Sequence, residues 1–328
     1  MREVRIGKND GGQRLDKFLT KALPTLPPSL LYKSIRLKKI KVNRKRATPN
    51  QMLCEGDTLQ LFLSEEFFGS KGETPRAATL AAIRPSLSIL YEDEEILLVN
   101  KRAGLSVHED EGGSSATLID QIQAYLYQKG EYDPTKEQSF APALCNRIDR
   151  NTQGIVIAAK TAEALRVMDE KLRLRELNKY YLTVVHGTPK AKTATLTAYL
   201  RRETGESKVR VFDTPREGAK EIRTRYRVLA TKDNLSLLEV ELLTGRTHQI
   251  RAHLAHIGHP ILGEGKYGVN REDRAKGYRH QALCSYRLTF AFTTPAGSLS
   301  HLNGKTVTIP PETIDFIRDL FPDAFPKE

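Results

Sequence analysis

The spacing of apolar residues divides the chain into a short N-terminal part built on helices and a longer part in which strands are frequent. Apolar side chains recur at helical intervals over residues 15–23 and again over 31–35, with two prolines between them. Ser29 follows these prolines and is predicted to cap the second helix. Residues 40–42 and 59–63 alternate apolar and polar side chains, which is typical of strands. Two helices and a small sheet are therefore expected near the N-terminus.

A stretch without either periodicity follows, over residues 64–86. Its first half contains Gly69-Ser-Lys-Gly-Glu-Thr-Pro75, alanines come next, and Pro85 ends it. This composition favours a loop-like connection. We therefore predict a module of residues 1–63, a linker of residues 64–86 and a larger domain of residues 87–328.

The larger domain mixes strand and helix patterns. Apolar runs at 96–99 and 155–159 predict buried strands, and helical spacing follows two predicted N-cap residues, Thr117 and Thr161. Longer alternating stretches predict strands with one solvated face: from Tyr181, and over 222–228, 235–242 and 286–292. The expected fold class is α+β, with a central mixed, mostly antiparallel sheet flanked by helices. No glycine-rich phosphate loop or dinucleotide fingerprint is present.

The chain has 328 residues and a formal net charge of +12. A length of this size is typical of about two domains. Residues 1–63 hold 14 Lys and Arg against 5 Asp and Glu, a net charge of +9, so the other residues carry only +3. The charge therefore indicates a polyanionic partner, and its distribution assigns most of the attraction to the N-terminal module.

Eight of these basic residues lie within residues 30–46, a segment without any acid. A solvated helix face is the ordinary explanation of a basic run, but eight like charges repel unless an anion lies nearby. We predict that they bind RNA. The residues are Lys33, Arg36, Lys38, Lys39, Lys41, Arg44, Lys45 and Arg46.

Membranes and disulfides are not expected to contribute. The first ten residues lack the apolar core of a signal peptide, and no run approaches ~18 uncharged apolar residues. The three cysteines, Cys54, Cys145 and Cys284, are far apart and odd in number. They argue against a disulfide framework and a Cys-based zinc site, and they fit a reducing cytoplasm.

Polar clusters interrupt the apolar elements at three places. The first is 146–154, where Asp149 lies between Arg147 and Arg150 and nearby positive charge favours its ionised form. Taken alone, this cluster fits a surface loop with weak ion pairs. The second is 179–187, where a strand tyrosine such as Tyr181 is usually part of a core.

The third cluster is 243–260. Gly245 and Thr247 are predicted to open a helix that ends at Gly258. Arg246, His248 and Arg251 would crowd its first turns, and positive charge opposes the helix dipole there, so an anion is expected nearby. Four histidines (His248, His253, His256 and His259) raise a metal site as an alternative, but His–Glu metalloprotease spacing is absent and we expect no metal.

Read jointly, the three clusters resemble the motifs of the RluA-type pseudouridine synthases. Residues 147–154 resemble the catalytic Arg-Leu-Asp motif, 179–187 the tyrosine motif, and 244–268 a long third motif. Further similar stretches are Gln281–Leu283 and 91–104. Departures from the family pattern occur at Arg102, Asn146, Gln153 and Cys284, none of which is expected to carry out chemistry. Residues 14–57 resemble the RNA-binding module of ribosomal protein S4, with Lys39 and Arg44 where that module usually has glycines.

The resemblance implies an isomerase that converts uridine in RNA to pseudouridine without a cofactor or metal. Asp149 would be the nucleophile, attacking the base or assisting departure at the sugar, and Arg251 would pair with it. Tyr181 would stack on the target base and Leu283 would pack against its other side. Arg147 would fill the stack position left by the flipped uridine. Arg246, Lys179 and Lys101 would contact phosphates.

The resemblance also suggests the partner. We expect a monomeric cytoplasmic enzyme acting on large-subunit ribosomal RNA, because basic front modules of this kind favour that RNA within the family. The alternatives are a synthase acting on transfer RNA, a catalytically silent RNA-binding or ribosome assembly factor, and a metal-dependent RNA hydrolase that uses the histidines. A silent factor is expected to have lost Asp149, which this chain keeps.

Overall fold

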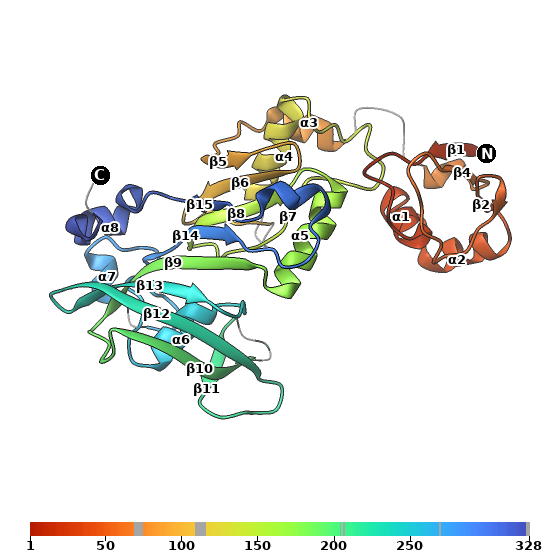
Figure 1. Ribbon diagram of the computed structural model, residues 1–328. Coiled ribbons are helices and arrows are strands. Elements are labelled where there is room, and N and C mark those ends of the chain that lie inside the picture. The colour runs from red at the N-terminus through yellow and green to blue at the C-terminus, as the bar shows by residue number, and fades with distance from the viewer. Residues whose placement is uncertain (69–74, 109–115, 204, 206, 269, 326–328) are drawn as a thin grey trace.

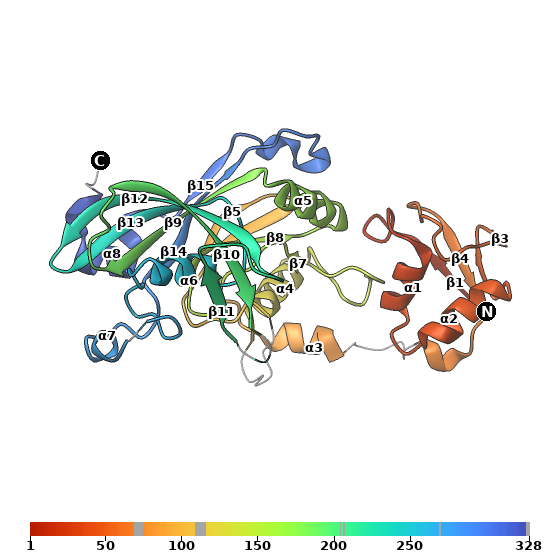
Figure 2. The same cartoon turned by 90° about the horizontal axis from the view of Figure 1, so that it is seen from below.

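The computed structural model describes residues 1–68, 75–108, 116–203, 205, 207–268 and 270–325. Figures 1 and 2 show a small N-terminal body at one end of a larger body built around a long, curved sheet. Segment 69–74, which contains most of the loop-like stretch named above, lies outside the described residues. No helix in the described ranges is long and apolar enough to cross a membrane.

The N-terminal body contains the two predicted helices and a four-stranded antiparallel sheet. Its helices are α1 (Leu15–Ala22) and α2 (Pro28–Arg36), and its sheet has the order β1-β4-β2-β3. The strands are β1 (Arg2–Arg5), β2 (Ile40–Val42), β3 (Lys45–Arg46) and β4 (Thr58–Leu61). Its core is formed by side chains such as Phe18, Leu19, Ile35 and Leu59, all at most 2% exposed.

Helix α2 begins two residues earlier than predicted. Pro27 is its N-cap residue and Pro28 its first helical residue, and no side chain caps it, so the prediction that Ser29 is the cap is wrong. Proline suits the first helical position because its missing N–H would have no partner there. Ser29 therefore lies inside the first turn.

Residues 64–86 are more structured than a loop. A short 3-10 turn covers Glu65–Phe67, and α3 covers Pro75–Ala82. Leu80 on α3 is fully buried in the apolar cluster that also contains Leu118 and Ile122 of α4 (Leu118–Gln128). The alanine-rich part of the predicted linker thus forms a helix, because alanine favours helix and the apolar face of α3 packs against α4.

The larger body is organised by an 11-stranded mixed sheet. Its strand order is β11-β10-β12-β13-β9-β14-β8-β6-β5, with β15 beside β14 and β7 beside β8. Among the described strands only β14 and β8 pair in parallel, so the sheet is mostly antiparallel as predicted. The strands are β5 (Ile89–Glu92), β6 (Ile96–Lys101), β7 (Ala143–Leu144), β8 (Gln153–Ala159), β9 (Leu177–His186), β10 (Thr193–Arg202), β11 (Val209–Phe212), β12 (Lys220–Lys232), β13 (Leu235–Leu242), β14 (Leu283–Phe290) and β15 (Thr306–Thr308).

Helices cover both faces of the sheet's central strands. Side chains alternate along β6 and β8, so Leu98 and Ile157 join the cluster that contains α5, whereas Leu97 and Val156 join that of α4. Thr117 caps α4 in a capping box, and Thr161 caps α5, as predicted. The remaining helices are α5 (Ala162–Leu174), α6 (Gln249–His256), α7 (Arg271–Ala275) and α8 (Asp315–Leu320), with 3-10 turns at Gly297–Leu302, Pro311–Thr313 and Pro322–Ala324.

Helix α6 begins later than the sequence indicated. It starts at Gln249, with His248 before it in a left-handed conformation at φ 55°, so Arg246 precedes the helix. The Gln249 side chain accepts bonds from Thr244 Oγ1 and Arg246 N and donates to Thr224 Oγ1. These bonds hold residues 244–248 as a loop over β12, and the prediction that Gly245 and Thr247 open the helix is wrong.

Polar contacts join the two bodies. Asp10 Oδ1 accepts hydrogen bonds from both N and Oγ of Ser139, at 3.1 and 2.6 Å. Asn9 bonds to Glu137 and to the backbone N of Ala162 at the start of α5. The N-terminal body is thus attached to the segment that leads into β7 and to one end of α5.

Candidate active site

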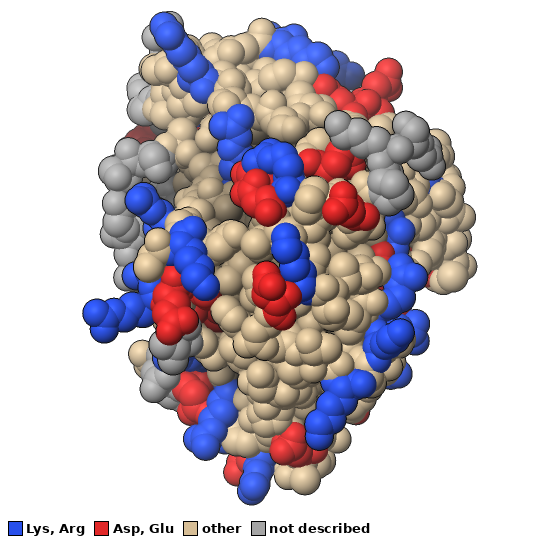
Figure 3. All heavy atoms as spheres, turned by 90° about the vertical axis from the view of Figure 1, so that its left-hand side faces the viewer, with Lys and Arg blue, Asp and Glu red and all other residues tan. Residues whose placement is uncertain are grey.

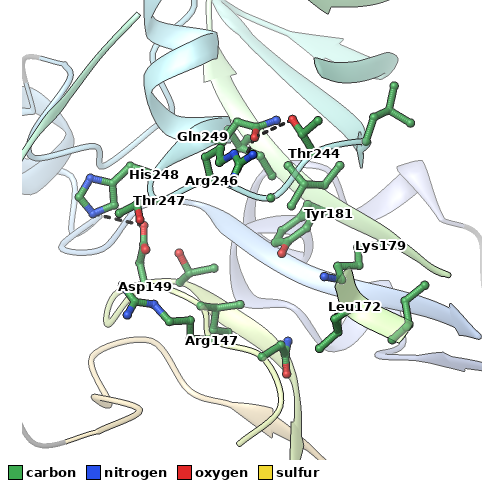
Figure 4. A pocket seen from close by; sticks show the side chains of 18 of the residues that line it. Arg147, Asp149, Leu172, Lys179, Tyr181, Thr244, Arg246, Thr247, His248 and Gln249 are labelled. Atoms are coloured by element: carbon green, nitrogen blue, oxygen red, sulfur yellow. Dashed lines mark hydrogen bonds and ion pairs between the residues drawn. The ribbon is translucent and has the colours of Figure 1, made fainter. Parts of the chain in front are cut away.

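The three polar clusters of the sequence meet at one cavity of about 720 Å³ (Figure 4). The loop before β8 supplies Asp149, the start of β9 supplies Lys179 and Tyr181, and the segment from β13 into α6 supplies Arg251. Of the eight substrate-site residues predicted from the sequence, seven line this cavity. They are Arg147, Asp149, Lys179, Tyr181, Arg246, Arg251 and Leu283.

Close packing of two strands places the Asp149 loop. Thr152 N donates to the carbonyl of Asp149, which turns the chain into β8. Gly154 follows at φ 133°, and a Cβ there would lie 2.5 Å from both the N and the O of Ser285. Only glycine permits this approach of β8 to β14, and Leu283 of β14 consequently lies beside the same cavity as Asp149.

Arg251 is held between two carboxylates. Its Nη1 donates to Asp149 Oδ2 at 2.6 Å, while Nε and Nη2 donate to the two oxygens of Glu264 at 2.7 and 2.8 Å. Burial by itself would lower the pKa of Arg251, but its ion pairs outweigh burial and raise it. Burial would raise the pKa of Glu264, yet the bond and charge of Arg251 lower it. The bidentate pair fixes the guanidinium and aims one N–H at Asp149.

Sequence reasoning missed the role of Glu264. Its side chain is completely buried and pairs with Arg251 thirteen residues earlier in the chain. The only signal was a carboxylate directly after the apolar stretch Ile261–Gly263, inside the long third motif. A buried acid of this kind requires a cationic partner, but the sequence does not show which of several arginines supplies it.

A second chain of hydrogen bonds ends beside Asp149. The hydroxyl of Tyr267 accepts from Val209 N at 3.0 Å, so its own proton is directed to His248 Nδ1 at 2.7 Å. This network assigns the remaining ring proton to Nε2, which lies 3.8 Å from Asp149 Oδ2. Burial lowers the pKa of His248 to about 4, with the charge of Asp149 acting against it. His248 is therefore neutral at pH 7.

Tyr181 and Leu283 form apolar walls of the cavity. They are 7% and 4% exposed and come from the neighbouring strands β9 and β14. Burial raises the pKa of Tyr181 to about 12, a bond with Ser285 acting against it. The phenol thus keeps its proton at neutral pH and offers its ring to the cavity (Figure 4).

Lys101 does not lie in the cavity. It is 1% exposed, and its ammonium donates to the carbonyls of Arg102, Leu105 and Arg150 at 2.8–3.0 Å. Burial lowers the pKa of Lys101 to about 8, although Asp149 opposes this. Its three N–H groups are used and no phosphate can reach them, so the predicted role in phosphate contact is wrong. Lys101 instead ties the Asp149 loop to the turn after β6.

The four histidines of the third cluster contact different partners. His248 bonds to Tyr267, His253 to Thr224, His256 to Asp213, and His259 to a backbone carbonyl. Across the described ranges, no three His, Cys, Asp or Glu side chains are placed to hold a metal ion together. A hydrolase that uses a histidine-bound metal therefore has no support in this geometry.

Comparison with known proteins identifies the family of the chain. The family described as RNA pseudouridylate synthase matches residues 95–256, and the S4 domain matches residues 13–59. Ribosomal large subunit pseudouridine synthase C of Yersinia pestis is 31% identical over 277 residues, which cover 83% of this chain and 81% of that protein. Its counterpart in Haemophilus ducreyi is 34% identical over 266 residues, 80% of this chain and 78% of that protein. The chain belongs to the RNA pseudouridylate synthase family.

Solved synthases share the fold. Human RNA pseudouridylate synthase domain containing 1 has a TM-score of 0.52 at 22% identity, covering 75% of this chain and 100% of that one. Human RNA pseudouridylate synthase domain containing 4 has a TM-score of 0.53 at 20% identity, covering 71% and 90%. The predicted family, α+β fold and reaction class are confirmed: the protein is an RNA pseudouridine synthase, an isomerase that acts on RNA.

The S4 domain of this synthase carries the eight basic residues of segment 30–46. They lie on α2, β2, β3 and the turns between them, and seven are exposed while Lys41 is half-buried. None of the eight forms an ion pair in the described part of the chain. Arg44 and the preceding Asn43 have φ of 63° and 51°, so the β2–β3 turn keeps its left-handed geometry without glycine.

Proposed function

We propose that this synthase isomerises specific uridines in large-subunit ribosomal RNA, with Asp149 as the nucleophile. The observation that carries the assignment of Asp149 is its carboxylate, which lines the cavity and pairs with Nη1 of Arg251 while Nε and Nη2 of that arginine bind Glu264. The substrate class is supported by the relatives, which are named ribosomal large subunit pseudouridine synthase C.

The reaction conserves atoms. The bond between N1 of uracil and C1′ of ribose breaks, the base rotates, and C5 bonds to C1′. The C5 proton is released to solvent and N1 takes up another. Asp149 supplies the electron pair for one covalent step, and Arg251 orients the carboxylate through its hydrogen bond to Oδ2. Tyr181 and Leu283 would enclose the base, and the exposed Arg147 would occupy the position that the flipped uridine leaves in the RNA stack.

We also propose the domain boundaries, the cellular compartment and the oligomeric state of the protein. An S4 domain of residues 1–63 would be joined through residues 64–86 to a catalytic domain of residues 87–328, each built on its own apolar core. The enzyme would be cytoplasmic, since its three cysteines are unpaired thiols and its substrate is RNA, and it would act as a monomer.

Mapping of pseudouridines tests the substrate. Ribosomal and transfer RNA would be compared between wild-type cells, cells that lack the gene and cells complemented with Asp149→Asn. We expect one or more pseudouridines to disappear from large-subunit RNA in the last two strains only. If pseudouridines disappear only from transfer RNA, the substrate is transfer RNA instead. An unchanged map of pseudouridines would contradict the proposed function.

A further inference from the structure

One wall of the cavity lies beyond Tyr181 from Asp149, and of its residues only Lys179 has so far been given an expected role, in phosphate contact. It is formed by the end of α5 and the start of β9, and it includes Arg173, Arg175 and Lys179. In Figure 4, Asp149 and His248 lie on one side of Tyr181, while Lys179 and Leu172 lie on the other. Lys179 and Tyr181 are two residues apart in β9, so their side chains project from the same face of the strand.

The positive charges of this wall are poorly matched by acids. The two carboxylates that line the cavity have partners elsewhere, because Asp149 pairs with Arg251 and Glu241 pairs with Arg225. Arg173 has only an exposed contact with Glu170, at 3.6 Å. Neither Lys179 nor Arg175 has an ion pair within the described residues.

Lys179 is the least ordinary of the three. Its side chain is half-buried at the cavity wall, and burial lowers the pKa of its ammonium group. A buried cation without a carboxylate is stabilised when an anion binds beside it. The site is thus better suited to a charged ligand than to an empty, solvated cavity.

The backbone at Arg175 provides an independent observation. Arg175 ends α5 in the left-handed conformation, with φ 61° and ψ 36°, where glycine is the usual residue. Keeping a long side chain at such a position costs stability, and strain of this kind is typically retained where the side chain has a function. Arg44 of the S4 domain and His248 beside Asp149 occupy the same strained region.

We propose that Arg173, Arg175 and Lys179 form a basic subsite that binds a backbone phosphate of a nucleotide neighbouring the target uridine. The proposal rests on the proposed function, because a base stacked on Tyr181 brings its own strand past Lys179. An arginine guanidinium binds two phosphate oxygens through parallel hydrogen bonds. Such a contact neutralises the phosphate charge and also fixes the register of the RNA strand. The subsite therefore positions RNA and takes no part in the bond changes.

The variant Arg175→Gly tests this subsite without a risk to folding, because glycine prefers the observed backbone conformation. We expect an unfolding temperature equal to or above that of the wild type. With ribosomal RNA transcripts labelled with tritium at C5 of uridine, kcat/KM should fall about tenfold, mainly through KM. The slope of log affinity against log salt should also fall by nearly one.

Asp233→Gly is the matched control. Asp233 also has a positive φ, of 50°, but lies in the β12–β13 turn and does not line the cavity. It should gain similar stability and keep the wild-type KM. An Arg175→Gly variant with the KM and salt slope of Asp233→Gly would overturn the proposal.

Substrates with one neutral linkage identify the contact directly. Short RNAs that carry a single methylphosphonate at successive positions around the target uridine would be assayed with both enzymes. One position should lower kcat/KM for the wild type but not for Arg175→Gly. Equal effects on both enzymes at every position would contradict the subsite, whereas absence of tritium release by the wild type would refute the proposed function instead.

Discussion

Arg251 donates to Asp149 through Nη1 alone, because its Nε and Nη2 bind Glu264. The arrangement leaves the other oxygen of Asp149, Oδ1, without a hydrogen bond from any described residue. A nucleophile needs an oriented carboxylate with one accessible oxygen, and a bidentate pair with Arg251 would have removed it. Glu264 is thus a positioning residue that acts through Arg251.

The variant Glu264→Gln tests that role. It leaves the buried cation of Arg251 with one carboxylate in place of two, so we expect a loss of about 2 kcal/mol in the free energy of unfolding and at least a tenfold fall in kcat. Thermal unfolding and tritium release measure the two effects. Asp315→Asn is the control, because its pair with Arg318 is exposed and worth less than about 0.5 kcal/mol. Equal behaviour of the two variants would contradict the positioning role.

The sequence predicted only those site residues that lie in motifs resembling the family's, in the same order along the chain. Asp149 and Arg251 are 102 residues apart, and no periodicity links them, so their pairing followed from the family motifs. Glu264, Tyr267 and the orientation of His248 depend on the packing of loops around α6, which no local pattern reveals. Lys101 was misassigned because a lysine in a turn gives no sign that three carbonyls will enclose it.

At the scale of elements, the close approach of β8 to β14 positions the loop that carries Asp149. Strands β8 and β14 run in parallel, and Gly154 makes room for the backbone of Ser285. Gly154→Ala should cost about 3 kcal/mol or more, since Cβ would lie 2.5 Å from backbone atoms, and it should reduce kcat by moving the Asp149 loop.

Gly130→Ala separates this clash from backbone strain. Gly130 also has a positive φ, of 78°, but nothing lies within 4 Å of its added Cβ. It should cost about 1 kcal/mol and leave activity intact. Chemical denaturation with an activity assay compares the two variants, and equal losses would show that the approach of β8 to β14 is unimportant.

Helix α6 makes stability depend on pH. His253 is 1% exposed and faces Thr224 of β12, and burial lowers its pKa to about 4. The unfolded chain therefore takes up the proton first as the pH falls from about 6.5. The stability that depends on a neutral His253 is fully present above about pH 6.5. The free energy of unfolding falls by about 2 kcal/mol between pH 7 and pH 5 as the unfolded chain binds the proton. His253→Gln should make that part of the curve less steep and leave the share that His248 contributes through its own lowered pKa. The exposed His280→Gln serves as the control, and denaturation at each pH measures the slopes.

Elements with a strong local signal were predicted well, and the exceptions have physical causes. The capped helices α4 and α5 and the apolar strands β6 and β8 are where periodicity indicated them. The start of α6 was missed because the side chain of Gln249 binds four residues and keeps the residues before it non-helical. Helix α3 was missed because its apolar face becomes evident only against α4.

At the scale of the whole molecule, the charge separates binding from catalysis. Figure 3 shows the end of the molecule opposite the S4 domain, where basic and acidic side chains alternate. Segment 30–46 of the S4 domain has eight basic side chains without acids, and the domain is attached through Asp10 and Asn9 to the segment leading into β7. The basic segment expected to bind RNA and the cavity expected to alter it thus lie in different parts of the molecule.

Removing two of these charges should weaken RNA binding without affecting stability. The double variant Lys45→Ala, Arg46→Ala should raise the Kd for ribosomal RNA about tenfold and reduce the salt slope by about 1.5. Binding titrations at several salt concentrations measure both. Lys276→Ala with Arg279→Ala removes the same charge from exposed positions after α7, and we expect no change in slope there. Equal slopes for the two double variants would contradict RNA binding by the S4 domain.

Release of tritium from RNA labelled at C5 of uridine tests the central claim most directly. Wild-type protein should release one tritium for each pseudouridine formed. Asp149→Asn keeps the size of the side chain but loses the nucleophile, so release should fall by about a thousandfold or more while RNA binding stays within about twofold. Release by Asp149→Asn at a rate near that of the wild type would contradict the account.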